Sequence, residues 1–599
     1  MKYLELLAPA RNTDIGIAAI DCGADAVYIG GPGFGARKDA GNPLSEIERL
    51  CSYAHTFGAR IFLTVNVTLE DSQMEEVHNL MLQAQQAGVD AFIVRDPVIN
   101  TWDDITVPLH ASTQCALRDA AKAREYASMG FSRLILERQL SLEQIKEAAA
   151  AAGGCELEFF VHGALCTGYS GDCYLSEALS GRSANKGECI QACRSLYDLV
   201  DSRGNVLVKN KALLSLKDFN LLTRMEDLAE AGVSSFKIEG RLKNASYVKN
   251  VVREYSLALD NLIARHPDKY SRASFGTVTG GFIPDSNKTF NRGYTQLFLD
   301  GRRAKWASME APKSMGECIG KVISVRPAGK YDMFIDLKPL KGVTSLNNGD
   351  GFCFVDGHQI TGFRGDVCKG FNIQCKTVQG LKPGVTLYRN INAAFEKELQ
   401  NNMCRRLIPA SISLTIAGSE GSGYRIEASA HTQDGRTAST VLDVQVPAAQ
   451  NKARMEAIIQ SQFSKTLSHY IITPDRILNN SSDDSMPLLS ASVLNGICRK
   501  LASDLDSLPC GRIPLGKVSR PQGRVMKENA APVNGELMRS KYCIRYELGI
   551  CPVHQGAADS GPLFLLNNGR RFALGFDCRN CEMTVKNDLS PWSSEGLKV

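Results

Sequence analysis

Four cysteines lie close together between residues 166 and 193. Cys166 and Cys173 occur in "HGALCTGYSGDC", and Cys189 and Cys193 follow in "NKGECIQACR", which gives the spacing C-x6-C-x15-C-x3-C. This spacing has neither the paired C-x2-C knuckles of a zinc ribbon nor the C-x-x-C pair of a thioredoxin. An iron-sulfur cluster accepts irregular spacing, because four thiolates need only converge on its corners. The pattern favours a cluster-binding loop, with structural zinc or four buried free cysteines as the alternatives.

A second set of four thiols lies near the C-terminus. Cys543 and Cys551 form a C-x7-C pair in "KYCIRYELGICPVH", and Cys578 and Cys581 form a C-x2-C knuckle in "FDCRNCEM". This arrangement is typical of a small unit held together by a metal ion, and zinc is the preferred ion. His554 is an alternative ligand for one of the cysteines, and a second iron-sulfur cluster is the alternative to zinc.

Protease chemistry is a further candidate, since His162 stands near Cys166 and the two side chains could form a Cys-His dyad. None of the nine histidines stands in an H-E-x-x-H pattern, and "GYSGD" lacks the second glycine of a G-x-S-x-G elbow. A nucleophilic thiol needs one cysteine, whereas a cluster needs all four. The four-cysteine loop therefore favours a cluster over a protease.

The elements that must position the first set are short apolar runs that alternate with helical stretches. Glycines follow the helical stretches in "AAIDCGAD", "AQQAGVD", "EYASMGF" and "LAEAGVSS". Eight such units predict a TIM-type (β/α)8 barrel over residues 1–265, with the first set in a long insertion after the seventh strand. The predicted strands are residues 3–9, 26–30, 60–66, 91–96, 108–114, 133–138, 157–163 and 236–241.

Polar residues at the carboxyl ends of these strands are candidates for the active site, because barrel enzymes bind substrates at that face. Inter-strand salt bridges are the structural alternative for each of them, but the group as a whole indicates a pocket for an anionic or polar ligand. The candidate catalytic residues are Arg37, Glu137, His162, Lys237, Glu239 and Arg241.

The rest of the chain is divided by changes in composition. We expect a linker over 266–310, a small β-barrel domain over 311–400, an α+β domain over 401–510 and the cysteine-rich unit over 536–599. Residues 511–535 form a basic linker that either binds RNA phosphates or is merely solvated. Its cations are Arg512, Lys517, Arg520, Arg524 and Lys527.

Composition limits the class of protein. The net charge of +5 permits nucleic-acid binding without requiring it. No apolar run reaches the roughly 18 residues of a membrane helix, and the charged N-terminus does not resemble a signal peptide. Nineteen cysteines are unusual for a cytoplasmic protein without metal sites or catalytic thiols. We expect a cytoplasmic protein that does not enter membranes; the oligomeric state is open.

Several phrases resemble the motifs of peptidase family U32. They are "ELLAPA", "DAVYIGGPGFGAR", "ERQLSL", "HGALCTGYSGDCYLS", "GRSANKGECIQACR", "FKIEGRLKNASYV" and "FNRGYTQLFLDG", so the similarity extends beyond the barrel. The resemblance implies a [4Fe-4S] cluster on Cys166, Cys173, Cys189 and Cys193. It also implies an RNA nucleobase hydroxylase, which at this size forms 5-hydroxycytidine in 23S rRNA, with prephenate, a dicarboxylate, as a hydroxyl donor.

Shorter relatives imply other activities. These are hydroxylation of a tRNA uridine and a role in ubiquinone hydroxylation, and the family name itself implies a peptidase. Some ubiquinone-pathway relatives use a cysteine further downstream, but this chain has none between Cys193 and Cys318. That difference favours the RNA-modifying branch. A non-catalytic RNA-binding protein with metals as structural supports is the remaining alternative.

Overall fold

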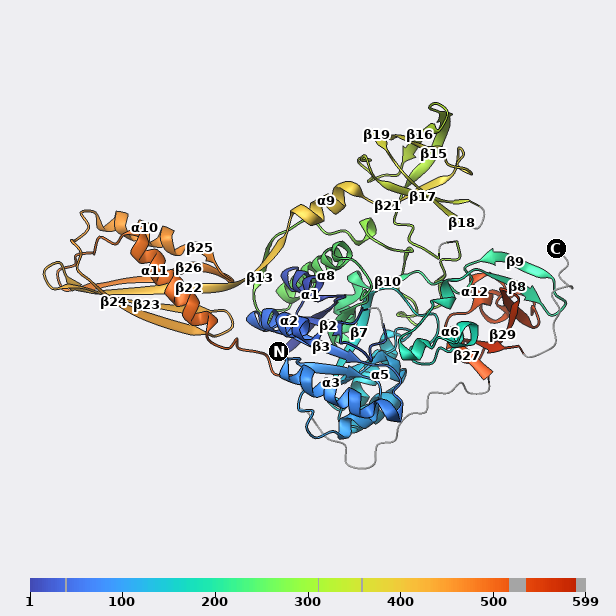
Figure 1. The fold of residues 1–599 in the computed structure, drawn as a ribbon, viewed down its shortest axis with the longest axis horizontal. Helices are drawn as coiled ribbons and strands as arrows, with labels where there is room; N and C mark the ends of the chain where they lie inside the picture. The colour runs from blue at the N-terminus through green and yellow to red at the C-terminus, as the bar shows by residue number, and fades with distance from the viewer. Residues whose placement is uncertain (38–39, 311, 357–358, 516–534, 589–599) are drawn as a thin grey trace.

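The computed structural model describes residues 1–37, 40–310, 312–356, 359–515 and 535–588. Its centre is a closed barrel of eight parallel strands in chain order, in which the last strand pairs with both the first and the seventh (Figure 1). Every predicted strand forms, so the predicted TIM-type barrel is confirmed. The strands are β1 (Lys2–Pro9), β2 (Ala26–Gly30), β3 (Arg60–Val65), β4 (Ala91–Val94), β5 (Leu109–Ala111), β6 (Arg133–Ile135), β7 (Glu156–Gly163) and β11 (Val233–Ile238).

Helices cover the outside of the barrel, and their apolar faces pack against strands that are buried on both sides. The glycines that follow the predicted helices have positive φ, as at Gly23 (103°) and Gly232 (111°), and so return the chain to the next strand. The helices are α1 (Thr13–Asp21), α2 (Leu44–Thr56), α3 (Met74–Gln86), α4 (Ala120–Ser128), α5 (Leu142–Ala151), α7 (Met225–Glu230) and α8 (Ala245–Arg265).

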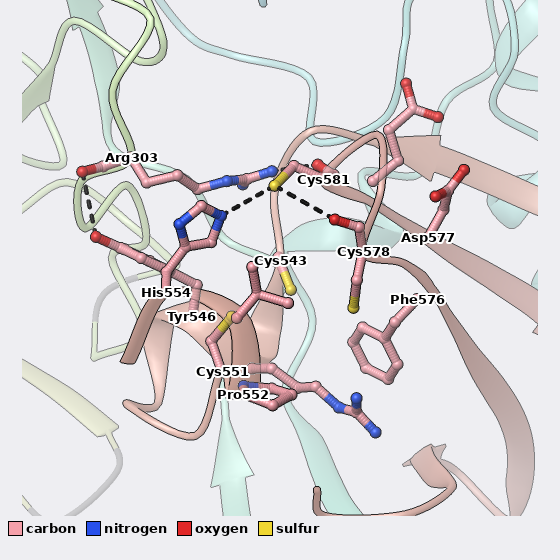
Figure 2. A pocket seen from close by; sticks show the side chains of 13 residues that line it. Arg303, Cys543, Tyr546, Cys551, Pro552, His554, Phe576, Asp577, Cys578 and Cys581 are labelled. Atoms are coloured by element: carbon pink, nitrogen blue, oxygen red, sulfur yellow. Dashed lines mark hydrogen bonds between the residues drawn. The ribbon is translucent and has the colours of Figure 1, made fainter. Parts of the chain in front are cut away.

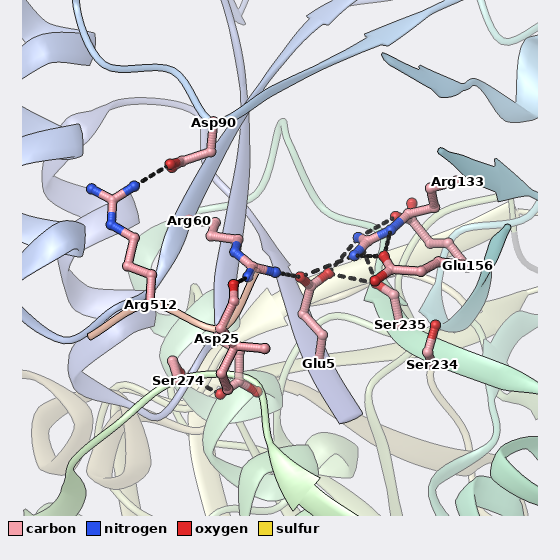
Figure 3. A network of polar contacts seen from close by, with 12 residues as sticks. Glu5, Asp25, Arg60, Asp90, Arg133, Glu156, Ser234, Ser235, Ser274 and Arg512 are labelled. Carbon is pink, nitrogen blue, oxygen red and sulfur yellow. Dashed lines mark hydrogen bonds and ion pairs between the residues drawn. The ribbon is translucent and has the colours of Figure 1, made fainter. Parts of the chain in front are cut away.

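A network of buried charges fills the barrel interior below the mouth (Figure 3). Arg133 donates to Glu5, to Glu156 (2.6 Å) and to Glu158 (3.2 Å). Glu158 also accepts a hydrogen bond from Lys237 (2.6 Å). Because each buried charge has an opposite partner, the network fixes the register of the strands that carry it.

The long insertion between β7 and β11 carries the first cysteine set. It contains α6 (Leu175–Ser180), β8 (Tyr197–Asp201), β9 (Val206–Lys211) and β10 (Asp218–Asn220). β10 pairs with the end of β7, whereas β8 and β9 leave the barrel and join a sheet of the C-terminal unit. The insertion therefore links the barrel mouth to the C-terminal unit.

Residues 266–310, expected as a linker, pack along the barrel and add strands to two sheets. β12 (Tyr270–Arg272) pairs with β1, β13 (Thr277–Gly280) with β22 (Cys404–Ser419), and β14 (Tyr294–Thr295) with β10. Strands of two to four residues leave no periodic pattern in the sequence, so composition alone predicts a linker here.

Residues 312–401 form a separate antiparallel sheet with its own apolar core, placed above the barrel in Figure 1. Helix α9 (Ala393–Asn401) leads from this sheet to β22. The strands are β15 (Glu317–Pro327), β16 (Asp332–Pro339), β17 (Gly351–Asp356), β18 (Gln359–Arg364), β19 (Val367–Lys369), β20 (Asn372–Lys376) and β21 (Thr386–Ile391).

The next domain is a sheet with two helices on one face, and it projects away from the barrel (Figure 1). Alternating burial along β22 and β23 shows that only one face of the sheet is covered. Besides β22, its elements are β23 (Gly423–Thr432), β24 (Thr437–Val444), α10 (Lys452–Phe463), β25 (Lys465–Leu467), β26 (Tyr470–Ser481) and α11 (Ala491–Asp506).

The C-terminal unit returns to the barrel mouth and forms one sheet with β8 and β9 of the insertion, in the order β27-β30-β29-β28-β8-β9. Within the described residues, no helix combines the length and the apolar character needed to cross a membrane. The elements of the unit are β27 (Glu536–Ser540), α12 (Ile544–Glu547), α13 (Pro552–Gln555), β28 (Leu563–Asn567), β29 (Arg570–Asp577) and β30 (Glu582–Asn587).

Candidate functional site

A cavity of ≈1210 Å³, here called the mouth cavity, lies at the carboxyl ends of the barrel strands. Three thiols line it together with six cationic side chains but only two carboxylates. This balance of charge suits an anionic ligand. The thiols are Cys166, Cys189 and Cys193, the cations are Arg37, Arg138, Arg182, Arg194, Lys243 and Arg292, and the carboxylates are Glu188 and Glu239.

All four cysteines of the first set line a second cavity of ≈580 Å³, here called the thiol cavity. It shares Arg37 and three of the thiols with the mouth cavity, so the two adjoin. Burial raises the pKa of the Cys173 thiol, and the charges of the other three thiols raise it further. The four sulfur atoms are thus close enough to interact, although they come from separate parts of the insertion.

Two glycines allow the first part of this loop to fold tightly against the barrel. A Cβ atom at Gly163 would lie 2.5 Å from the carbonyl oxygen of Glu239, and one at Gly171 would lie 2.1 Å from that of Gln114. Both glycines also have positive φ, 106° and 86°. A side chain at either position would therefore push the cysteine loop away from the strand ends.

Glu137 anchors the same loop. Its carboxylate accepts hydrogen bonds from the backbone N–H groups of Ser170 (2.8 Å) and Arg138 (2.9 Å). The residue is buried, and burial raises the pKa of its carboxyl group even though Arg138 and both N–H groups act against the rise. These contacts give Glu137 a part in holding the loop, and it does not line either cavity.

Arg37, Arg138 and Glu239 form the charged wall of the mouth cavity. The Arg138 guanidinium lies 3.4 Å from Glu239 and donates to Ser170 Oγ (2.9 Å). Burial acts to raise the pKa of Glu239, but Arg37, Arg138 and Arg241 together hold it below the usual value. Glu239 is therefore ionised at neutral pH, and it orients cations that face the cavity.

His162 does not face either cavity. Phe160 pairs with Lys237 and His162 pairs with Ile238, so Val161 forms a β-bulge that breaks the alternation along β7. The imidazole packs among three tyrosine rings outside the barrel, and burial lowers its pKa to about 3. The rings belong to Tyr247, Tyr255 and Tyr294, at 5.5–6.1 Å between centroids.

This placement argues against the Cys-His dyad, the alternative that the sequence left open. In the described structure His162 Nδ1 has no hydrogen-bond partner, while the Cys166 side chain opens into the mouth cavity. The neutral, enclosed imidazole is not positioned to take a proton from that thiol.

Lys237 and Arg241 lie beneath the cavity wall. Lys237 pairs with Glu158 and lies over the rings of Tyr28 and Phe160, 4.4 and 5.3 Å from their centres. Arg241 donates to Thr64 Oγ1 (2.8 Å) and is buried. Both residues support the cavity electrostatically without lining it.

Lys243 and Arg292 line the cavity, although sequence analysis did not select them. Lys243 lies over the Phe290 ring, 2.9 Å from its centre, and Arg292 pairs with Asp218 (2.9 Å). Both residues stand in phrases that carry the family resemblance, "FKIEGRLKNASYV" and "FNRGYTQLFLDG", and this was the available signal. Arg292 comes more than 50 residues after the last barrel strand in the sequence, so it does not stand out as a residue at the end of a strand.

The C-terminal cysteines line a separate cavity of ≈350 Å³ together with His554 (Figure 2). In the part of the chain that the structure describes, no three Cys, His, Asp or Glu side chains are arranged as a metal site. In each set the thiols face one cavity without the geometry of coordination. Of the basic linker, Arg512 pairs with Asp90 (2.6 Å), and Lys517, Arg520, Arg524 and Lys527 lie outside the described residues.

The fold and site define a TIM-barrel protein whose mouth carries a thiol-lined, cationic pocket. The sequence profile described as peptidase family U32 matches residues 11–308. The chain is also 34% identical over 97% of its length to a 23S rRNA 5-hydroxycytidine synthase of Escherichia coli, and it covers 94% of that protein. The chain belongs to peptidase family U32.

Other relatives have different names. A tRNA hydroxylation protein of Bacillus subtilis is 32% identical over 58% of this chain and 82% of its own length. An uncharacterised protease of Methanocaldococcus jannaschii is 32% identical over 64% of this chain and 94% of its own length. The similarity to the rRNA hydroxycytidine synthase therefore covers more of the domains after the barrel than the similarity to either of these two relatives does.

Proposed function

We propose that this protein is an RNA nucleobase hydroxylase that forms 5-hydroxycytidine in 23S rRNA. The observation that carries the proposal is the mouth cavity, where three thiols and six cations meet at the catalytic face of the barrel. The similarity to an rRNA 5-hydroxycytidine synthase along almost the whole chain supports the choice of substrate. An RNA substrate supports a cytoplasmic location, where thiols also stay reduced.

The donor set of the thiol cavity fits a [4Fe-4S] cluster. Cys166, Cys173, Cys189 and Cys193 line it, and its lining contains no imidazole or carboxylate, whereas a catalytic zinc site normally uses them. When bound, such a cluster supplies electron transfer or a Lewis-acidic iron. The adjoining mouth cavity gives a small ligand access to three of the four thiols.

Arg37 and Lys243 are the groups that we assign to the carboxylates of a small dianionic donor such as prephenate. Arg194 is committed to the protein, since it donates to Ser215 Oγ (2.8 Å) and to the carbonyl oxygen of Leu165 (2.9 Å). Arg292 is similarly held by Asp218. Lys243 forms no ion pair with a carboxylate of the described residues, so its ammonium group is available to the ligand.

The RNA base must be extruded to reach this cavity, because ring carbon atoms are inaccessible within a stacked helix. We assign the grip on the surrounding RNA to the sheet of residues 312–401 and to the C-terminal unit. The domain that carries β22 packs at the amino ends of the barrel strands, away from the mouth, where Arg406 donates to the carbonyl oxygen of Ala24 (2.6 Å) (Figure 1). In this division of roles, the barrel holds the cluster and the donor, and the extruded base enters the mouth.

A cluster-binding variant tests the proposal. Cys173→Ser should bleach the visible absorption of anaerobically purified protein and abolish 5-hydroxycytidine, measured by nucleoside mass spectrometry of rRNA from a complemented deletion strain. Cys155→Ser is the matched control, because Cys155 donates to the carbonyl oxygen of Phe131 (3.0 Å) away from the cavities and serine can do the same.

The same experiment separates the alternatives. If the deletion strain keeps its rRNA hydroxycytidine but loses a hydroxylated tRNA uridine, the substrate is tRNA. If both RNAs are unchanged and the deletion affects ubiquinone hydroxylation, the protein acts in that pathway. A colourless, iron-free wild-type protein that cleaves a peptide would establish a peptidase and overturn the proposed function.

A further inference from the structure

The second thiol set belongs to two loops that face each other across one cavity of the C-terminal unit (Figure 2). Cys543 and Cys551 are the residues immediately before α12 and α13. Cys578 and Cys581 lie in the turn between β29 and β30. Thiols from segments about 27 residues apart are therefore brought to one place by the sheet.

The turn that carries Cys578 and Cys581 is held in a fixed shape. Asp577 Oδ1 accepts hydrogen bonds from the N–H groups of Arg579 and Asn580, both at 3.1 Å. Cys581 itself is in the left-handed region, with φ 53°, which a residue with a side chain adopts only when surrounding contacts favour it. The Arg303 guanidinium also donates to the carbonyl oxygen of Cys581.

An imidazole from the opposite loop contacts this turn. His554 Nε2 lies 3.1 Å from Cys581 Sγ, within hydrogen-bond distance for a sulfur acceptor. An N–H group directed at a thiolate stabilises the deprotonated sulfur that a metal ion requires. The contact therefore joins α13 to the turn that carries the two thiols of the knuckle.

The chemistry of these groups favours zinc. Two pairs of thiols, one with C-x2-C spacing, offer the four soft ligands of a structural tetrahedral site. The cavity is small, and it lies within a short C-terminal segment, where a metal ion contributes directly to folding.

The C-terminal unit also holds the loop of the first cysteine set. The N–H groups of Tyr169 and Tyr174 donate to the carbonyl oxygens of Arg539 (2.9 Å) and Leu537 (2.7 Å) in β27. Met538, between these two, lines the thiol cavity. Any loosening of the C-terminal unit is thus transmitted to the residues between Cys166 and Cys173.

We propose that Cys543, Cys551, Cys578 and Cys581 bind one structural Zn²⁺, with His554 hydrogen-bonded to the Cys581 thiolate, and that this site keeps β27 against the first cysteine loop. Zinc binding here is independent of the proposed hydroxylase activity. It follows from the positions of the thiols and the imidazole alone.

The test measures metal content of the full-length protein by inductively coupled plasma mass spectrometry. Wild-type protein should contain one zinc per chain, and Cys578→Ser should lose it, whereas Cys318→Ser, at a half-buried free thiol of another domain, should retain it. Cobalt added in place of zinc should give the absorption bands of tetrahedral thiolate ligation. A wild-type protein without zinc, or zinc retained by Cys578→Ser, would overturn the proposal.

A milder variant covers the case in which Cys578→Ser does not fold. His554→Ala leaves the four thiols in place and should weaken zinc affinity by about 10-fold to 100-fold, the usual effect of losing a group that hydrogen-bonds to a ligand. Competition with a zinc chelator measures this change. Unchanged affinity would overturn the role of His554, and chelation that leaves thermal stability unchanged would overturn the stabilising role of zinc.

Discussion

Ligand binding in the mouth cavity should weaken as the pH rises through 8, because Lys243 loses its proton there. Burial lowers the pKa of Lys243 to about 8; among the charged groups around it, Asp218 and Glu239 raise the pKa, and Arg292 and Arg194 lower it. Only the ammonium form attracts a carboxylate. The affinity of the wild-type protein for prephenate should therefore depend on the protonated fraction of this one side chain.

The pKa fixes the size of the effect. With a pKa of about 8, the apparent Kd is multiplied by about 1.1 at about pH 7 and by about 11 at about pH 9, an increase of roughly tenfold. The unfolded state keeps this proton up to about pH 10.5. The folded state consequently binds fewer protons between the two pKa values, and the contribution of Lys243 to the free energy of unfolding rises with pH across that window.

Isothermal titration calorimetry with prephenate over this pH range measures the dependence. Lys243→Met should bind weakly at every pH and show no inflection near pH 8. Lys243→Arg should bind with a nearly constant Kd, because its guanidinium stays charged. A wild-type Kd that is independent of pH, or an inflection that persists in Lys243→Met, would refute the assignment of Lys243 to the ligand.

Two further substitutions test the barrel and the cysteine loop. Glu158→Gln removes the ion-pair partner of buried Lys237 and one of three carboxylates around Arg133, and it should lower the free energy of unfolding by about 3–5 kcal/mol, measured by chemical denaturation. Glu156→Gln, at a more exposed position, should cost less; equal losses would contradict the role of burial. Gly171→Ala should reduce bound iron, because its Cβ would meet backbone, whereas Gly496→Ala meets no atom within 4 Å and should leave iron unchanged. Full iron content in Gly171→Ala would show that the loop can move.

The barrel and its cysteine loop were predictable from sequence because both depend on local patterns. Strands buried on both faces appear as short apolar runs, and the glycines after the helices mark the returns. The four cysteines of the loop are close in the chain, so their convergence in one cavity required little tertiary information. Eight βα units also implied that residues such as Arg37 and Glu239 would meet at one face.

The position of His162 was not predictable from the same patterns. Alternation along β7 places it in the mouth, but one extra residue at Val161 turns it toward α8. A bulge has no reliable signature in a single sequence, since it depends on the register of the neighbouring strand. A one-residue shift therefore moved a catalytic candidate out of the site.

By itself, the sequence determined the barrel, the two sets of four thiols and the cationic character of the strand ends. The tertiary structure decided which cations face the ligand cavity, namely Arg37, Arg138 and Lys243, and which are neutralised beneath it, such as Lys237. It also decided that the C-terminal unit pairs with β8 and supports the cysteine loop. These outcomes depend on packing between segments hundreds of residues apart, and local periodicity carries no information about such contacts.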